Sequence, residues 1–451
     1  MSVSCQIEKS KETHNNSWFR LNIVLKRRAF LSIVIFTLAS YLCIFKVPVG
    51  NLVYGERKGP IDCTSRNYSR QGKTFGTQDS APLKPQCENL LFNLTNGAWV
   101  MHKEYNQSVI QEIETTISLV RKSLSFPKVY WRKDGKCGAK VTLPGGKTAS
   151  MCDHTSSKPC CSNKLSGVCS KADSMACFCP DCLDMRKYIH GEVAKWKPND
   201  NRCRMIHYKP HEACAVLNAN TIRRKFYFVG DSLIRNTFLG LMISLSGRTE
   251  DGAMKGCTTK KSKNLCRGNL QFMLYDCLVE TAQSTDDVSN TSLCNGGHRN
   301  FDVEFKPYFS SKYSNEFYSL VQSVLHQNET YLAVGIGVLD HCDVNKVINQ
   351  FLNPALMLLK QEKAKWPKIT WVLPLKAGVI SPWKYWGLCN VEDGLNSFSA
   401  RMRNFLDINE IKTFDFRKLT TFVYSYDGTH CGMGVNIMKA QIWLNYMATV
   451  L

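Results

Sequence analysis

The chain has 451 residues, 44% hydrophobic and 21% charged, so it can bury a full core, and its composition argues against wholesale disorder. The formal net charge of +21 favours acidic partners such as anionic glycans or membrane surfaces. Nucleic acid is not expected as a partner, because the sequence contains no zinc-finger spacing, RNA-binding aromatic signature or basic recognition helix.

The first element along the chain is an apolar segment near the N-terminus. Residues 29–45 carry no charge and follow the basic run 26–28. This length is at the short end for a membrane-spanning helix, and the basic flank predicts a cytoplasmic N-terminus. A cleaved signal peptide is the alternative, but no convincing small-x-small cleavage site follows. We therefore predict a single-pass type II membrane protein with a cytoplasmic tail (1–28), a transmembrane signal anchor (29–47) and a stem (48–85).

Cysteines and glycosylation sequons support a lumenal location for the rest of the chain. Of 21 cysteines, 19 follow the apolar segment, a density typical of an oxidising compartment. Because 19 is odd, at least one thiol is expected to be free or to pair between chains. Five sequons lie on the same side, at Asn67, Asn93, Asn106, Asn290 and Asn328.

The next part of the chain is rich in cysteine and poor in long apolar runs. Ten cysteines lie between Cys137 and Cys214. Cys177-x-Cys179-x-x-Cys182 is compatible with zinc, but disulfides account better for such spacing in a lumenal chain, and we predict no bound metal. We predict that 86–221 forms a disulfide-rich subdomain packed on the catalytic domain. Within it, the apolar spacing over 108–124 predicts an amphipathic helix.

From residue 222 onward the pattern alternates between strands and helices. This order predicts an α/β catalytic domain over 222–451 with a mostly parallel sheet between two helical layers. The predicted strands cover 225–229, 270–275, 331–338, 369–373 and 412–416, and the predicted helices include 316–326, 344–360 and 433–451.

A serine motif opens this region. The apolar run 226–229 leads into Gly230-Asp231-Ser232, and 237–245 suits a helix. A serine at such a turn stands at the carboxyl edge of the sheet, where neighbouring backbone N–H groups converge as an oxyanion requires. A structural serine at a strand end is the alternative interpretation.

A serine hydroxyl is a poor nucleophile without a general base. The best candidate is His430 in Asp427-Gly428-Thr429-His430, just before the last predicted helix. Asp427 would hold the imidazole in the required tautomer and stabilise its charge. Turn chemistry at Tyr426-Asp427-Gly428 allows an exposed turn instead. We predict that Ser232, His430 and Asp427 meet.

The paired blocks resemble the SGNH-hydrolase superfamily, in which the serine lies in the first block and Asp-x-x-His in the last. Residues 229–236 look like the Gly-Asp-Ser-Leu-x-Arg-Asn block of the PC-esterase group, and Cys87 with Gly97-x-Trp99-Val100 is similar to the opening of its plant members. That group includes the plant trichome-birefringence-like polysaccharide O-acetyltransferases and the animal sialic acid O-acetyltransferase. The resemblance implies an SGNH-like three-layer α/β/α fold and a Golgi enzyme that transfers acetyl groups to sugar hydroxyls through an acyl-serine.

The sequence also departs from the resemblance. His430 is followed by Cys-Gly-Met-Gly rather than the Trp-Cys-Leu-Pro-Gly of plant members, so a plant substrate cannot be carried over. The stretch 335–341 follows a strand but lacks the asparagine that the superfamily places after its glycine block. We expect an oxyanion or substrate-binding role for Gly230 and Asp231, with Arg235 or Asn236 donating beside the Ser232 N–H.

The leading hypothesis is a lumenal carbohydrate O-acyltransferase, with acetyl as the expected group, in the Golgi membrane. No bound cofactor is expected; acetyl-CoA or an acetylated carrier would be the co-substrate, a glycan or glycoconjugate the acceptor, and a separate transporter would supply a cytosolic donor. Two alternatives remain open: an acylesterase with the same triad, and a catalytically silent glycan-binding or adhesion protein.

Overall fold

The structure is a computed structural model that describes residues 87, 89–102, 106–124, 140–143, 146–149, 188–218, 222–273, 275–288, 293–376, 378 and 392–451. The predicted signal anchor and stem, and most of the cysteine-rich segment, lie outside these ranges. All described residues belong to one compact unit, 81–451. In the ranges just given, no helix has both the length and the apolar character that crossing a membrane demands.

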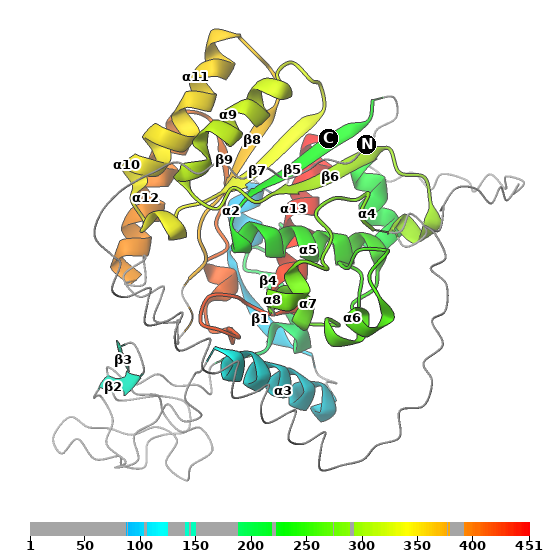
Figure 1. Ribbon diagram of the computed structural model, residues 1–451. Coiled ribbons are helices and arrows are strands. Elements are labelled where there is room, and N and C mark those ends of the chain that lie inside the picture. Colours follow the sequence, from blue (N-terminus) through cyan, green and yellow to red (C-terminus); the bar gives the residue numbers. More distant parts are fainter. Residues whose placement is uncertain are drawn as a thin grey trace, which may run out of the picture. The chain divides into compact units, whose positions relative to one another are not determined.

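A five-stranded parallel sheet forms the centre of this unit (Figure 1). The strand order is β6-β5-β7-β8-β9. Strand β5 pairs with β6 on one side and β7 on the other, so that Gly230 at its end lies opposite Gly335 at the end of β7. The strands are β5 (Arg224–Gly230), β6 (Phe301–Lys306), β7 (Thr330–Gly335), β8 (Lys368–Val372) and β9 (Lys412–Phe414).

Helices cover both faces of the sheet, because successive side chains of each buried strand point to opposite sides. Phe226 and Phe228 of β5 belong to one hydrophobic cluster, whereas Val229 belongs to the other. The first cluster contains α4 (Pro210–Leu217), α5 (Ser232–Ser246) and α13 (Met433–Val450). The second contains α9 (Ser314–Ser323), α10 (Val344–Lys346), the π-helical turn η6 (Val347–Leu352), α11 (Asn353–Gln361) and α12 (Glu392–Ile408). The result is the three-layer α/β/α arrangement that alternating strands and helices predict.

One predicted strand was wrong, and one strand of the sheet was not predicted. The stretch 270–275 is not a strand but falls in α7 (Leu270–Met273) and α8 (Tyr275–Leu278). The buried Gln271 side chain bonds the backbone of 249–253, and the Cys266–Cys277 disulfide closes the segment on itself, so local contacts decide its conformation. The strand we missed is β6, whose alternating burial is typical of an edge strand.

Part of the predicted cysteine-rich subdomain packs on the α/β layers. Strands β1 (Gly97–Met101) and β4 (Ala194–Pro198) form an antiparallel pair, and their Trp99 and Trp196 rings meet edge to face with centroids 5.5 Å apart. Trp99 Nε1 donates to Leu419 O at 2.8 Å, which ties this pair to the C-terminal part of the chain. The remaining elements include α2 (Leu90–Thr95), α3 (Gln107–Ser123), β2 (Lys140–Leu143), β3 (Gly146–Ala149) and α6 (Lys260–Leu265).

Disulfides cross-link the described residues, as the high cysteine content predicts. Cys87–Cys203 and Cys214–Cys294 link segments far apart in sequence, and Cys266–Cys277 closes a short loop. In the part of the chain that the structure describes, Cys257 and Cys431 are free thiols, exposed and buried respectively.

Candidate active site

The turn that follows β5 positions Ser232. Gly230 has φ +154°, and a Cβ there would lie 2.1 Å from Gly335 O, so only glycine fits. Asp231 is the N-cap of α5, and its Oδ1 accepts from Leu233 N at 2.9 Å. Ser232 is therefore the first residue of α5, at the carboxyl edge of the sheet, and stays half-buried.

Ser232, His430 and Asp427 form a continuous chain of hydrogen bonds. The Ser232 Oγ lies 2.7 Å from His430 Nε2, and His430 Nδ1 lies 2.6 Å from Asp427 Oδ2. Both distances are in the range of strong hydrogen bonds. Two segments 198 residues apart in sequence thus meet as we predicted.

The Asp427 carboxylate is held in a fixed orientation. Its Oδ1 accepts from Thr429 N at 2.9 Å and from His430 N at 2.7 Å, which leaves Oδ2 facing the imidazole. Burial alone would raise the pKa of Asp427, but His430 and these backbone donors outweigh it and hold the pKa below its usual value. An ionised Asp427 fixes the proton of His430 on Nδ1 and leaves Nε2 as an acceptor for the serine hydroxyl.

The loop that carries Asp427 and His430 is fixed by residues distant in sequence. Arg121 of α3 donates to the carbonyls of Ser425 and Tyr426, both at 3.3 Å. Gly378 N donates to Gly428 O at 2.8 Å, and Tyr426 N closes the loop on His430 O at 2.9 Å. Two distant parts of the chain, together with a hydrogen bond within the loop, therefore determine where the imidazole lies.

Glu192 and Asn269 support the helix that begins just after His430. Asn269 Oδ1 accepts from Met433 N at 2.6 Å. Glu192 Oε1 accepts from the buried Tyr426 hydroxyl at 3.2 Å, and the nearby backbone of Met433 and Gly434 also favours the ionised carboxylate. Burial raises the pKa of Glu192 in spite of these donors. We did not identify Glu192 or Asn269 from the sequence, and no local pattern marks either residue.

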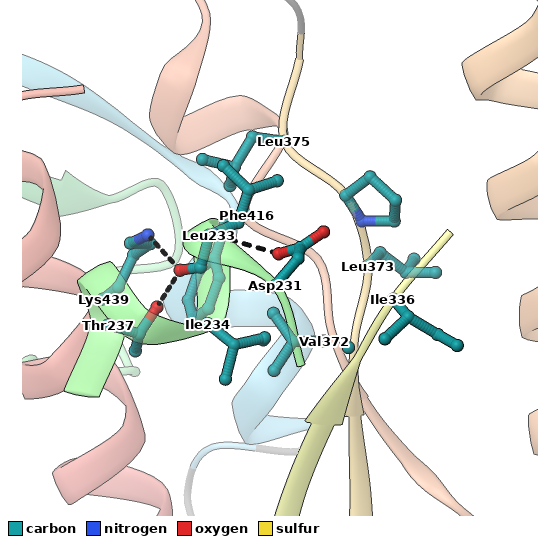
Figure 2. A pocket seen from close by; sticks show the side chains of 12 residues that line it. Asp231, Leu233, Ile234, Thr237, Ile336, Val372, Leu373, Leu375, Phe416 and Lys439 are labelled. Carbon is teal, nitrogen blue, oxygen red and sulfur yellow. Dashed lines mark hydrogen bonds between the residues drawn. The ribbon is translucent and has the colours of Figure 1, made fainter. Parts of the chain in front are cut away.

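A buried lysine lies beneath the serine turn (Figure 2). Lys439 of α13 donates from Nζ to Leu233 O at 3.3 Å, and Thr237 Oγ1 donates to the same carbonyl at 3.0 Å. Lys439 and Asp231 both line a cavity of about 10 Å³, a space for about one water molecule. Burial raises the pKa of Asp231 to about 6 and lowers the pKa of Lys439 to about 8, and the ionised Asp231 opposes the latter shift. The two groups thus stabilise each other's charge around the first turn of α5.

The candidate oxyanion donors lie one helical turn apart at the start of α5. Asn236 is 1% exposed, and its Oδ1 accepts from Arg235 Nη2 at 3.3 Å, which turns the amide N–H₂ away from Arg235. Neither this amide nitrogen nor the Ser232 backbone N–H has a partner among the described residues.

The stretch after β7 has a structural role at Asp340. This buried carboxylate accepts from Ser311 N and, at 2.6 Å, from Ser311 Oγ, and it lies 3.6 Å from Lys346 Nζ. All its near partners thus belong to the face of the sheet covered by α9, so we assign it no role at Ser232.

Of the predicted glycosylation sites, Asn106 and Asn328 are exposed and Asn93 is half-buried, whereas Asn67 and Asn290 lie outside the described residues. No group of three or more potential metal ligands occurs in the described part of the chain.

Comparisons with known proteins give weak structural similarities. No family model matches the chain, and no curated protein does. One similar solved structure is Est24, a carbohydrate acetylesterase from Sinorhizobium meliloti, at 13% identity and a TM-score of 0.30, covering 51% of this chain and 100% of Est24. Another is a catalytic mutant of Axe2, an acetylxylan esterase from Geobacillus stearothermophilus, at 12% identity and a TM-score of 0.26, covering 50% and 94%. Similarity at this level does not tell what this chain acts on.

Proposed function

We propose that the chain is a carbohydrate O-acyltransferase of the SGNH type that works through an acyl-serine, with Ser232 as nucleophile, His430 as general base and Asp427 as the residue that orients it. The observation that carries this proposal is the 2.7 Å and 2.6 Å hydrogen-bond chain from Ser232 through His430 to Asp427. We propose acetyl as the transferred group because 229–236 resembles the serine block of the PC-esterase group.

In the first step, His430 Nε2 takes the hydroxyl proton of Ser232 while Oγ forms a bond to the acyl carbonyl carbon. The carbonyl oxygen becomes an oxyanion, which the Ser232 N–H and the Asn236 amide would stabilise. Collapse of this intermediate breaks the bond to the leaving group, and the imidazolium returns its proton to that group. Asp427, ionised throughout, stabilises the transient positive charge on His430.

In the second step, His430 removes the proton of an acceptor hydroxyl, whose oxygen attacks the acyl-serine. The new ester leaves, and the proton returns to Ser232 Oγ. If the acceptor is a sugar hydroxyl the outcome is acyl transfer, and if it is water the outcome is hydrolysis. The same residues serve both reactions, so the acylesterase is a second candidate that the triad supports equally.

The partition between these acceptors is measurable. We would incubate the full-length chain with isotopically labelled acetyl-CoA, with and without an oligosaccharide acceptor, and count label in free acetate and in glycan ester. Our proposal predicts that label moves to the glycan at the expense of acetate. Release of acetate alone, unaffected by acceptor, would favour the esterase; glycan binding with no turnover of any ester would favour a silent binding protein.

The proposed setting is the Golgi lumen, with the chain held by its own N-terminal anchor. The described disulfides and the exposed sequon residues Asn106 and Asn328 support an oxidising, glycosylating compartment. No bound cofactor enters the mechanism, and a cytosolic acetyl donor would need a separate transporter.

A further inference from the structure

A groove with several basic residues in its lining lies beside the β1–β4 pair. Its volume is 530 Å³, and Lys195, Lys197 and Arg204 line it together with His102, His207 and Val100. Lys195 and Lys197 are two residues apart on β4, so both side chains leave the strand on the face away from the buried Trp196. Their Cα atoms are therefore about 7 Å apart along the strand.

The positive charge of this groove is not neutralised by the protein. Lys195 and Lys197 lie opposite Val100 and Ala98 in the strand register, which provide no counter-charge. In the described ranges neither lysine nor Arg204 has a carboxylate partner. The acidic residue that lines the groove is Asp200. Its two carboxylate oxygens already accept from Arg202 Nε at 3.0 Å and from Arg202 Nη2 at 2.8 Å.

His207, one of two histidines in the groove lining, reflects the same positive potential. Burial of part of the ring lowers the pKa of His207, and the charge of Lys195 lowers it further. At neutral pH His207 is therefore an uncharged hydrogen-bonding group beside the lysines. Cations, neutral hydrogen-bonding groups and the exposed apolar surface of Val100 together suit a sugar ring that carries an anionic substituent.

The groove is connected to the candidate active site through the protein. His102 N donates to Val193 O at 3.0 Å, and Val193 packs in one cluster with Tyr426, the residue that precedes Asp427. We propose that this β4 groove binds an anionic glycan through its carboxylate or sulfate groups, which anchors the acceptor for the acyl transfer proposed above. The role of the groove as an acceptor anchor rests on the proposed function. The binding of an anionic glycan can be measured independently of that function.

The test is equilibrium binding by the full-length chain in a non-ionic detergent. The probes are a heparin-derived hexasaccharide, an oligogalacturonate of the same length, a neutral dextran oligomer, and vesicles of phosphatidylserine. The groove variant is Lys195→Glu/Lys197→Glu. Its matched control is Lys363→Glu/Lys365→Glu, which makes the same charge change at two exposed lysines between α11 and β8.

We expect the groove variant to bind at least one of the two anionic oligosaccharides about tenfold more weakly, and the control less than about twofold, because only the former removes contacts with the anion. The neutral oligomer should bind weakly to all three proteins. Preference between the sulfated and the carboxylated probe identifies the anion. Equal weakening by both variants, or retained binding by the groove variant, would overturn the proposal, as would a defect confined to vesicles, which would indicate a membrane-binding face.

Thermal unfolding of the variants shows whether each is folded, and Lys195→Gln/Lys197→Gln is expected to give an intermediate loss of binding. The proposed function is tested by a different measurement, the acyl transfer activity of Ser232→Ala. Acyl transfer that survives Ser232→Ala would refute the acyl-serine, while the groove is judged by binding alone.

Discussion

The two sides of the candidate site are positioned in different ways. On the serine side, Gly230 and Asp231 next to Ser232 set the turn, and the helix that follows completes it. On the histidine side, the loop that carries Asp427 and His430 depends on Arg121 and on Glu192, both more than 230 residues away in sequence. The nucleophile is therefore placed mainly by its own strand, turn and helix, against which Gly335 and Lys439 pack, and the base mainly by tertiary contacts. A distant substitution can misplace His430 without moving Ser232.

The largest expected effect comes from breaking the contact between the two sides. His430→Ala removes the base, and we expect kcat to fall by about 10³-fold or more. Asp427→Asn keeps the size of the side chain but removes the charge that stabilises His430, and kcat should fall by a similar factor. Steady-state kinetics with an activated acetyl ester measures both. Activity within a few fold of wild type in either variant would exclude the proposed relay.

The next largest effect is a loss of stability on changing Gly230, in the turn that positions Ser232. Gly230→Ala places a methyl group against Gly335 O at a backbone angle that other residues rarely adopt, so we expect a loss of about 3–5 kcal/mol in the free energy of unfolding. Chemical denaturation measures it. The control is Gly394→Ala in α12, where a Cβ meets nothing within 4 Å and the protein should gain about 0.5 kcal/mol. Similar stabilities of the two variants would show that Gly230 does not constrain the turn.

A smaller effect tests the distant support of the histidine loop. Glu192→Ala leaves the buried Tyr426 hydroxyl without its acceptor and removes the carboxylate next to the start of α13, whereas Met433 N keeps Asn269 Oδ1 as its acceptor. Because a small displacement of the base slows the chemistry, we expect kcat to fall about 10- to 100-fold with little change in KM. Glu362→Ala, at an exposed position after α11, is the matched control and should behave as wild type. An unchanged kcat for Glu192→Ala would mean that the loop carrying His430 keeps its conformation without Glu192.

The smallest effect is a shift in the pH profile. Asp231 caps α5 best when ionised, so activity should decline as pH falls through its pKa of about 6. His430 and Arg235 favour the ionised form of Asp231. Asp231 in turn favours the charged form of Lys439, and because attraction between opposite charges is mutual, we expect Lys439 to favour the ionised Asp231. Lys439→Met removes one of these charges and should move the acidic limb of kcat/KM upward by about one pH unit. Lys439→Arg keeps the charge and should restore the limb; an identical profile in the Met variant would contradict the coupling.

The same contrast explains what the sequence could predict. The β5–Ser232–α5 junction is readable because an apolar run, a glycine, a capping residue and an apolar helix follow one another directly. The Asp427–His430 pair was readable as a motif and by its order in the chain. Glu192, Asn269 and Lys439 were not, since their partners are set only by the packing of α13 and the β1–β4 pair. Strand β6 was missed because charged residues occupy every second position, so no continuous apolar run marks it. The stretch 270–275 was misassigned because Gln271 and a disulfide override its apolar character.

The most direct test of the acyl-serine is to find it. We would mix the full-length chain with an activated acetyl ester, quench in acid within one turnover, and locate the acetyl group by peptide mass spectrometry. Our account predicts an acetyl group on Ser232. It also predicts no label at that peptide in Ser232→Ala. Acetyl found only on other residues, or equal labelling of the Ser232→Ala protein, would contradict it.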